Sequence, residues 1–206
     1  MSQPFLVIAT RNTGKLLELR ELLRGLPLTL CDLNYFSSIE PIAETGETFV
    51  ENACLKASGY ATQTQSMALA DDSGLEVTAL SGAPGVRSAR YAGAGASDAE
   101  RTKQLLAELS QESSSDRTAR FVSAVAVANR AGVILNVSVG ICEGRIAQAP
   151  QGHNGFGYDP IFVPNGYDRT FGELPAEVKS AISHRARALK ATLRFLRSLT
   201  VASGDD

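Results

Sequence analysis

The sequence predicts an α/β protein with a mixed sheet. Residues 5–9 form a short apolar run that leads through a polar turn into an amphipathic helix, and this strand–turn–helix order is typical of α/β folds. Residues 120–128 and 133–142 alternate, are rich in valine and flank Gly132, which is typical of a long antiparallel hairpin. The 206 residues are enough for one sizeable core, or for two lobes that share a sheet.

Composition and charge limit the classes of function. The net charge of -2 provides no global basic field for nucleic acid, so an anionic substrate has to meet a local cluster of Lys and Arg. Cys31, Cys54 and Cys142 are far apart, which favours reduced thiols over a disulfide framework or a zinc site. The start of the chain lacks a secretory-signal pattern, and no apolar stretch approaches the roughly 20 residues that span a bilayer. We therefore expect a cytoplasmic protein that binds neither membrane nor nucleic acid.

A polar turn follows the first strand. It consists of Thr10, Arg11, Asn12, Thr13, Gly14 and Lys15. The backbone N–H groups and the dipole at the start of the next helix, beside Lys15, suit a phosphate group. The turn is not a Walker A loop, because the upstream glycine is absent and Leu16 follows the lysine. An ordinary capped helix start explains the pattern at least as well, and a second strand is expected near residues 28–30.

A capping box predicts the next helix. Thr48 and Glu51 have the spacing of such a box, so the helix is expected to begin at about Phe49. Lys56 lies on this helix, and Glu44 lies just ahead of it, able to point at whatever the helix end approaches. Surface charges on a capped helix are the alternative interpretation.

Two adjacent carboxylates, Asp71 and Asp72, follow an apolar strand over residues 67–70. Ser73 and then Gly74, which permits a tight turn, indicate that the chain turns here. Adjacent strand residues point to opposite faces, so both carboxylates aim the same way only if the chain bends. Mg²⁺ suits such a pair, because its sites combine one or two carboxylates with waters and substrate phosphates. A solvated turn is the alternative.

The middle of the chain carries a glycine-rich loop over residues 82–91. In it, Arg87 and Arg90 are either phosphate ligands or exposed charges. Ser97 and Glu100 form another capping box, which predicts a further helix. The valine-rich hairpin that follows is expected to form a second lobe or a dimer-forming wing.

Residues 152–160 form a second polar stretch that could contact a ligand. Three glycines let the backbone approach a ligand closely, and Phe156 or Tyr158 could stack on a flat ring. Asp159 could pair with a base or with a lysine. A tight turn without function explains the stretch equally well.

The last helix begins with an unusual pair of residues. Ser183 is placed to cap it, so His184 and Arg185 occupy its first turn. The helix dipole disfavours cations there unless an anion is present. A bound phosphate or an electron-rich base would supply the compensation.

These motifs occur in a fixed order. They are Thr10-Arg11-Asn12-Thr13-Gly14-Lys15, Glu44-Thr45-Gly46, Glu51-Asn52-Ala53 with Lys56-Ala57, Ala70-Asp71-Asp72-Ser73-Gly74-Leu75, Gly82-Ala83-Pro84-Gly85, Ser88-Ala89-Arg90-Tyr91, Gly155-Phe156-Gly157-Tyr158-Asp159-Pro160 and Ser180-Ala181-Ile182-Ser183-His184-Arg185. Their conjunction resembles the inosine triphosphate pyrophosphatase family, whose bacterial members are dITP/XTP pyrophosphatases, also called Ham1-like or RdgB-like proteins. The resemblance extends from about residue 5 to residue 199.

The resemblance implies a fold and an activity. It implies one α/β domain over residues 1–206, in which two lobes flank a deep central cleft, with a flexible tail from about residue 200 and usually a homodimer. It also implies hydrolysis of non-standard purine nucleoside triphosphates (ITP, dITP and XTP) to the monophosphate and pyrophosphate, with Mg²⁺ as cofactor.

The resemblance also implies roles for particular residues. Asp72 becomes the proton acceptor and a metal ligand, Asp71 and Glu44 support the metal, and Lys56 acts in catalysis and on the triphosphate. The implied substrate-binding residues are Thr10, Arg11, Asn12, Thr13, Gly14, Lys15, Ser73, Phe156, Gly157, Tyr158, Asp159, Lys179, His184 and Arg185. Two positions depart from the family pattern: Arg11 replaces a common glycine, and Ala43 stands where some members have another acidic residue.

The implied chemistry agrees with the residue types. A triphosphate needs cations at its non-bridging oxygens, a metal and an oriented water. Donors aimed at the 6-keto oxygen would not form a hydrogen bond with the amino group of adenine. A site that requires this hydrogen bond can discriminate between the two bases by roughly 10⁴-fold. A Maf-like nucleotide pyrophosphatase and a non-catalytic nucleotide-binding module remain the alternatives.

Overall fold

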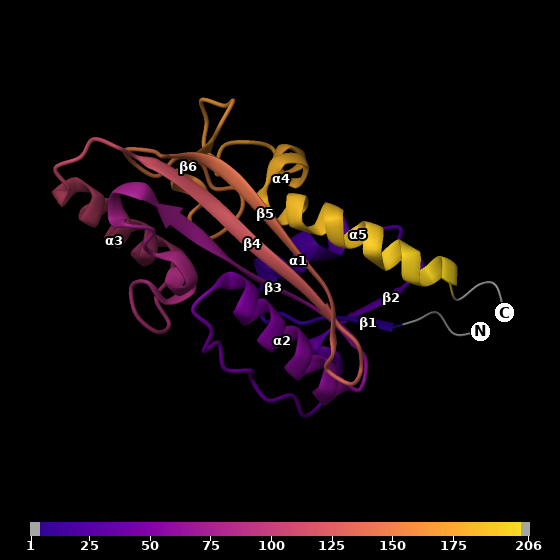
Figure 1. The fold of residues 1–206 in the computed structure, drawn as a ribbon. Coiled ribbons are helices and arrows are strands. Elements are labelled where there is room, and N and C mark those ends of the chain that lie inside the picture. Colours follow the sequence, from indigo (N-terminus) through magenta and orange to yellow (C-terminus); the bar gives the residue numbers. More distant parts are fainter. Residues whose placement is uncertain (1–4, 203–206) are drawn as a thin grey trace. The chain divides into compact units, whose positions relative to one another are not determined.

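The computed structural model describes residues 5–202, which form one six-stranded sheet and five α-helices (Figure 1). The strands are β1 (Phe5–Ile8), β2 (Thr29–Asp32), β3 (Met67–Val77), β4 (Thr118–Ala128), β5 (Ile134–Ile146) and β6 (Phe162–Pro164). The helices are α1 (Thr13–Leu22), α2 (Phe49–Thr64), α3 (Asp98–Gln111), α4 (Ala176–Ile182) and α5 (His184–Ala202). Four short 3-10 segments are η1 (Leu33–Tyr35), η2 (Thr78–Leu80), η3 (Gly85–Arg90) and η4 (Asp159–Ile161).

The sheet is mixed, as the sequence predicts. Its strand order is β2-β1-β3-β4-β5-β6. Strand β1 runs parallel to β2 and to β3, with Leu6 opposite Leu30 and Met67, whereas β6 runs antiparallel to β5. The α/β class is therefore confirmed.

Contacts divide the chain into two compact units, and each unit has its own core. Unit 1 contains the described residues up to Asp72, residues 123–140 and the chain from Arg185 onward, and unit 2 contains residues 73–122 and 141–184. Strands β3, β4 and β5 each give one part to unit 1 and the other part to unit 2.

Unit 1 has helices on both faces of its strands. Leu6 and Ile8 of β1 join one apolar cluster with leucines of α1 and α5. Helix α2 lies on the opposite side of these strands from α5 (Figure 1). Its buried residues Ala53, Ala57 and Ala61 are small, so the helix backbone can approach its neighbours closely.

The core of unit 2 is built around aromatic rings. Phe162 packs against Phe121 with ring centroids 4.5 Å apart and against Phe171 at 5.5 Å. Leu105 and Leu109 of α3 belong to the same cluster, because residues four apart on a helix lie on one face. Both predicted capping boxes are present, at Thr48 with Glu51 and at Ser97 with Glu100.

Two expectations about local structure are wrong. The chain does not turn at Asp71-Asp72-Ser73-Gly74, because β3 continues to Val77. Gly74 serves close packing instead: a Cβ there would overlap Ser88 Oγ and would lie 2.5 Å from the carbonyl oxygen of Gly85. The hairpin does not form a second lobe by itself, because β4 and β5 are interior strands of the sheet and each contributes to both units.

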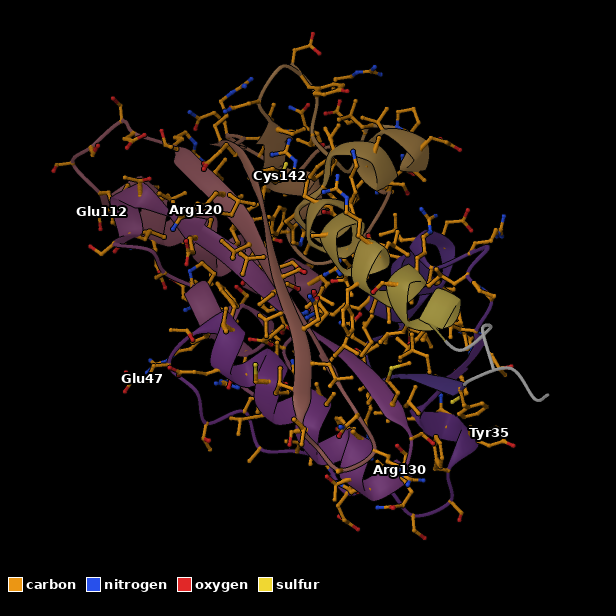
Figure 2. All side chains as sticks on the ribbon, turned by 45° about the vertical axis from the view of Figure 1, so that its right-hand side comes forward. Tyr35, Glu47, Glu112, Arg120, Arg130 and Cys142 are labelled. Atoms are coloured by element: carbon orange, nitrogen blue, oxygen red, sulfur yellow. The ribbon has the colours of Figure 1, made fainter. Side chains whose placement is uncertain are left out.

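Charged side chains cover much of the exterior. Glu47, Glu112 and Arg130 are exposed and project away from the ribbon (Figure 2). No helix within residues 5–202 is long and apolar enough to cross a bilayer. Helix α5 continues to Ala202, and the remainder of the tail expected from about residue 200 lies outside the described residues.

Candidate active site

The site in unit 1 is organised by the alternation of side chains along β3. Leu69 belongs to the apolar cluster that contains α1 and α5, and Asp71, two residues on, points to the same face. Asp72 points to the other face, where Lys56 of α2 meets it. A straight strand thus places two adjacent carboxylates in two different environments.

Asp71 is fully enclosed by cations and donors. Its side chain lies 2.8 Å from Lys15 Nζ and 3.6 Å from Arg185 Nη2, and it accepts a 2.5 Å hydrogen bond from the hydroxyl of Ser123. Burial alone would raise the pKa of Asp71, but Lys15, Arg185 and these hydrogen bonds hold the pKa of Asp71 far below its usual range. Burial lowers the pKa of Lys15 despite the attraction of Asp71.

Arg185 lies in the first turn of α5, one residue after His184, and is 1% exposed. It pairs with Glu18 of α1 as well as with Asp71. The sequence predicts that a cation in the first turn of α5 needs a nearby anion, and within the protein two carboxylates supply it. Glu18 and Asp71 thus compensate the charge of Arg185 within the protein.

Asp72 and Glu44 converge on one ammonium group. Lys56 Nζ donates to Asp72 Oδ1 at 2.6 Å and lies 3.3 Å from Glu44 Oε1. Burial disfavours the charged form of Lys56, but Asp72 and Glu44 raise the pKa of Lys56 above its ordinary value. Burial raises the pKa of Asp72, and Lys56 only partly opposes this.

Asp72 retains an acceptor that could bind a further cation. Its Oδ2 atom is buried and has no hydrogen-bond partner among the described residues. A buried oxygen without a hydrogen-bond partner destabilises the folded state, and a bound metal ion would remove this penalty. Within residues 5–202, no group of three or more His, Cys, Asp or Glu residues gathers that could hold a metal. The unpaired Oδ2 of Asp72, with Glu44 on the same lysine, fits Mg²⁺, which commonly takes one or two carboxylates and completes its shell with water and phosphate.

The polar turn predicted to hold phosphate begins α1. Asn12 is the N-cap of the helix, and its Oδ1 accepts from the backbone N–H of Lys15 at 2.9 Å. Thr10 Oγ1 accepts from the N–H of Asn12, and Arg11 donates to the carbonyl of Ile39 at 2.6 Å. Thr13 and Gly14 occupy the first turn, which contains no acidic residue. A helix start without acidic residues presents a positive potential that attracts anions.

Unit 2 contains a second set of predicted site residues. Asp159 accepts from the backbone N–H of Phe156 at 2.8 Å and pairs with Lys179. The ammonium of Lys179 lies 4.7 Å from the ring centroid of Phe156 and 5.8 Å from that of Phe171. Asp159 and Lys179 are buried, so this ion pair and the two rings hold one another in place.

The other predicted residues of unit 2 are fixed by separate contacts. Tyr158 is buried and donates to the carbonyl of Ser88 at 3.0 Å, and Gly157 donates its N–H to Asp98 at 2.6 Å. His184 stacks on Phe121 with ring centroids 4.6 Å apart. Ser73 is half-buried at the start of the part of β3 that belongs to unit 2.

Several supporting residues were not predicted from the sequence. Ser123 is a hydroxyl within a valine-rich strand, and that isolated polarity is a signal that could have identified it. Glu18 lies three residues after Lys15 on α1, so helical spacing could have placed both on one face. Phe121 and Asp98 have no comparable signal, because their partners are distant in sequence.

Comparison with known proteins adds independent findings. The profile of the Ham1 family matches residues 6–195. A protein of Coxiella burnetii named dITP/XTP pyrophosphatase is 48% identical over 186 residues, which cover 90% of this chain and 92% of that protein. A protein of the same name from Syntrophobacter fumaroxidans is 49% identical over 189 residues, covering 92% of this chain and 80% of that protein. The solved structure of a HAM1 protein from Coxiella burnetii matches with a TM-score of 0.85 at 46% identity, covering 96% of this chain and 98% of that one.

Proposed function

The chain belongs to the Ham1 family, and we propose that it hydrolyses dITP, XTP and ITP to the nucleoside monophosphate and pyrophosphate with Mg²⁺ as cofactor. The observation that carries this proposal is the environment of Asp72. This carboxylate is buried, has one oxygen on Lys56 and keeps the other without a partner among the described residues. Such a group suits metal binding and proton acceptance together.

We assign the phosphates to the start of α1. Lys15 and the residues from Thr10 to Gly14 supply a cation, hydroxyl groups and first-turn N–H groups for a triphosphate. Lys56 would hold a phosphate oxygen and keep Asp72 oriented. Bound Mg²⁺ would be held by Asp72 and Glu44 and would neutralise charge on the phosphates.

Asp72 would accept the proton of the attacking water. Lys56 keeps the Asp72 carboxylate in one orientation, and Oδ2 of Asp72 has no hydrogen-bond partner among the described residues, so this carboxylate is placed to accept a proton. Asp71 is also predicted from the sequence as a ligand, but its oxygens already contact Lys15, Arg185 and Ser123. We therefore assign Asp71 and Arg185 to positioning Lys15.

We assign recognition of the base to unit 2. Phe156 offers a ring for stacking, and Lys179, held by Asp159, offers donors to a keto oxygen. Ser73, Gly157, Tyr158 and His184 complete the proposed substrate-binding set.

Pyrophosphate release tests the proposal. We expect the purified protein to release pyrophosphate from dITP, XTP and ITP with Mg²⁺, but far less from dATP and dGTP, and to lose activity in EDTA. Asp72→Asn should lower kcat by at least about 10²-fold, the smaller effect of removing a general base. Asp168→Asn, which changes an exposed carboxylate, should leave kcat unchanged.

Other outcomes identify the alternatives. A preference for modified or pyrimidine bases would indicate a Maf-like enzyme. Stoichiometric nucleotide binding without pyrophosphate release would indicate a binding module. Near-normal kcat in Asp72→Asn would remove Asp72 from the chemistry.

We also propose that the chain forms a homodimer, and we expect it in the cytoplasm. A row of exposed apolar side chains supports the dimer: Val133, Leu135, Val137 and Val139, which alternate along the unit 1 part of the hairpin and are 38–57% exposed. A second copy could cover this row. Light scattering should give a dimer mass for the wild type and a monomer mass for Val137→Lys, and a wild-type monomer would contradict the proposal.

A further inference from the structure

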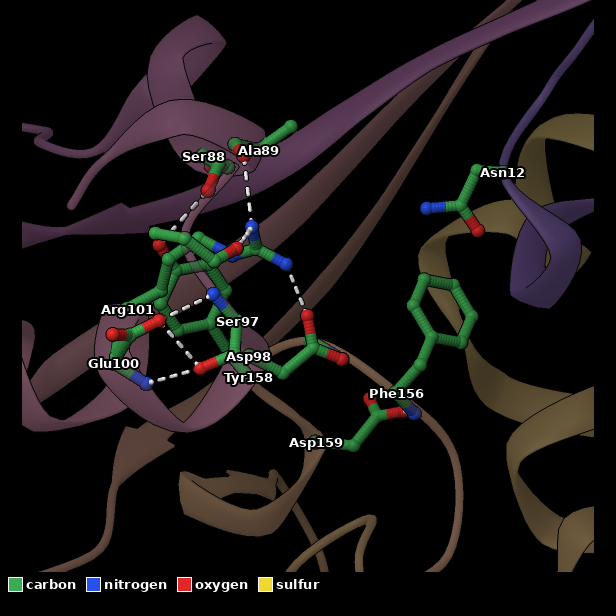
Figure 3. A network of polar contacts seen from close by, with 12 residues as sticks. Asn12, Ser88, Ala89, Ser97, Asp98, Glu100, Arg101, Phe156, Tyr158 and Asp159 are labelled. Carbon is green, nitrogen blue, oxygen red and sulfur yellow. Dashed lines mark hydrogen bonds and ion pairs between the residues drawn. The ribbon is translucent and has the colours of Figure 1, made fainter. Parts of the chain in front are cut away.

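One hydrogen bond in unit 2 joins the start of α3 to the loop that carries Phe156. Figure 3 shows Asp98 at the start of α3 with its ion pair to Arg101. Asp98 is the first residue of α3, and its Oδ2 accepts the backbone N–H of Gly157 at 2.6 Å. Its Oδ1 pairs with Arg101, one turn further along the helix. The two oxygens of one carboxylate thus bind two partners that are far apart in sequence.

Arg101 fixes the position of this carboxylate. Its guanidinium donates to the carbonyl oxygens of Ala89 at 2.9 Å and Ala96 at 2.5 Å, in addition to pairing with Asp98. A planar guanidinium held by three acceptors has little rotational freedom. The acceptor for Gly157 is therefore held in a defined place.

Helix capping does not explain Asp98. Ser97 accepts the N–H of Glu100, and the side chain of Glu100 accepts the N–H of Ser97, so the capping box is complete without Asp98. A carboxylate in the first turn also favours the helix dipole, but any acidic residue there would serve that purpose. The hydrogen bond to Gly157 is specific to the position of Asp98.

The loop needs such an anchor. Gly155 and Gly157 both have positive φ, at 74° and 63°. Because glycine adopts negative φ about as readily, these residues alone do not fix the backbone of the loop. Asp159 secures the N–H of Phe156 from inside the loop, and Asp98 secures the next N–H from outside. The two carboxylates together fix the peptide groups before and after Phe156.

We propose that Asp98, held by Arg101, is a positioning residue that sets the Phe156–Gly157 backbone for recognition of the purine base. This inference rests on the proposed function, because it assigns the base to Phe156 and its neighbours. Asp98 acts through the amide of Gly157 and does not touch the substrate. Loss of Asp98 affects base recognition and leaves phosphate binding intact.

The test compares Asp98→Ala with two matched variants. Asp98→Ala should raise KM for dITP about tenfold or more, the effect of losing a charge-assisted hydrogen bond, and change kcat less than twofold. It should also reduce the preference for dITP over dATP in kcat/KM. Asp98→Asn keeps an oxygen acceptor for Gly157 and should bring KM back to within about threefold of the wild type. Glu100→Ala breaks the capping box but leaves the anchor, so KM and base preference should stay at wild-type values.

A phosphate-only probe separates the two halves of the substrate. Inorganic tripolyphosphate has no base, so its inhibition constant should be the same for wild type and Asp98→Ala. An unchanged KM and base preference in Asp98→Ala would overturn the proposal, as would equal changes in Asp98→Ala and Glu100→Ala. If the wild type itself released no pyrophosphate from dITP, the proposed function would fail first, and that result is distinct from all of these.

Discussion

At the scale of single residues, Lys15 has two partners to satisfy. It neutralises the fully buried Asp71 and, as proposed, binds a phosphate oxygen. Lys15→Ala should therefore raise KM by about 10- to 100-fold, from the loss of a hydrogen bond to a charged group. It should also lower the free energy of unfolding by about 3 kcal/mol, because a buried carboxylate loses its nearest cation.

A second substitution separates these two effects of Lys15. Adding Asp71→Asn to Lys15→Ala removes the uncompensated charge, so stability in urea should recover while KM stays high. Recovery of both quantities together would mean that Lys15 acts only on Asp71 and not on the substrate.

Tyr158 gives a prediction for alkaline pH. Burial raises the pKa of Tyr158 well above its ordinary value of 10.0. Above about pH 10 this tyrosine ionises in the unfolded chain but not in the folded one, so the unfolded state binds fewer protons. Stability should fall as pH rises, by up to about 1.4 kcal/mol per pH unit from this residue. Urea unfolding at several alkaline pH values should show a shallower fall for Tyr158→Phe than for the wild type, and identical slopes would contradict the assignment.

At the scale of elements, the unbroken strand β3 depends on Gly74. A side chain there would meet Ser88 Oγ and the carbonyl of Gly85. Gly74→Ala should lower the free energy of unfolding by about 1–3 kcal/mol, as overpacking does. Ser88→Ala in the same chain should not restore stability, because the Gly85 carbonyl is backbone and because Leu75 loses the hydrogen bond that its N–H donates to Ser88. A double variant as stable as the wild type in chemical denaturation would show that the backbone gives way easily.

The same elements show what local sequence could and could not predict. Helices α2 and α3 begin where their capping boxes indicate, since a capping box is satisfied within four residues. The continuation of β3 through Asp71-Asp72-Ser73-Gly74 was not predicted, because those residue types favour a turn locally. Asp71 and Asp72 are instead compensated by cations on α1, α2 and α5, and these cations are distant from them in sequence.

At the scale of the whole chain, the family was easier to predict than the packing around individual residues. The order of short motifs was enough to indicate the family, which the profile match over residues 6–195 confirms. The motifs did not indicate that Asp71 and Asp72 face opposite ways, nor that Arg185 is buried against two carboxylates. Those features depend on packing between segments, which a motif does not encode.

Ligand binding provides a test on the intact protein. Asp72→Asn should bind nucleotide without cleaving it, so its melting temperature can be measured with the substrate itself. A ligand at about 100 times its dissociation constant stabilises the folded state by about 2.7 kcal/mol, which corresponds to roughly 5–10 °C for a chain of this length. Tripolyphosphate should raise the melting temperature less than dITP does, because it has no base for unit 2 and would contact only the proposed phosphate-binding residues of α1 and Lys56 of α2. dATP should also give a smaller shift than dITP, because an amino group replaces the keto oxygen that Lys179 is proposed to recognise. Equal shifts with dITP and dATP would contradict recognition of the base by unit 2, whereas no shift with tripolyphosphate would contradict the phosphate role of α1.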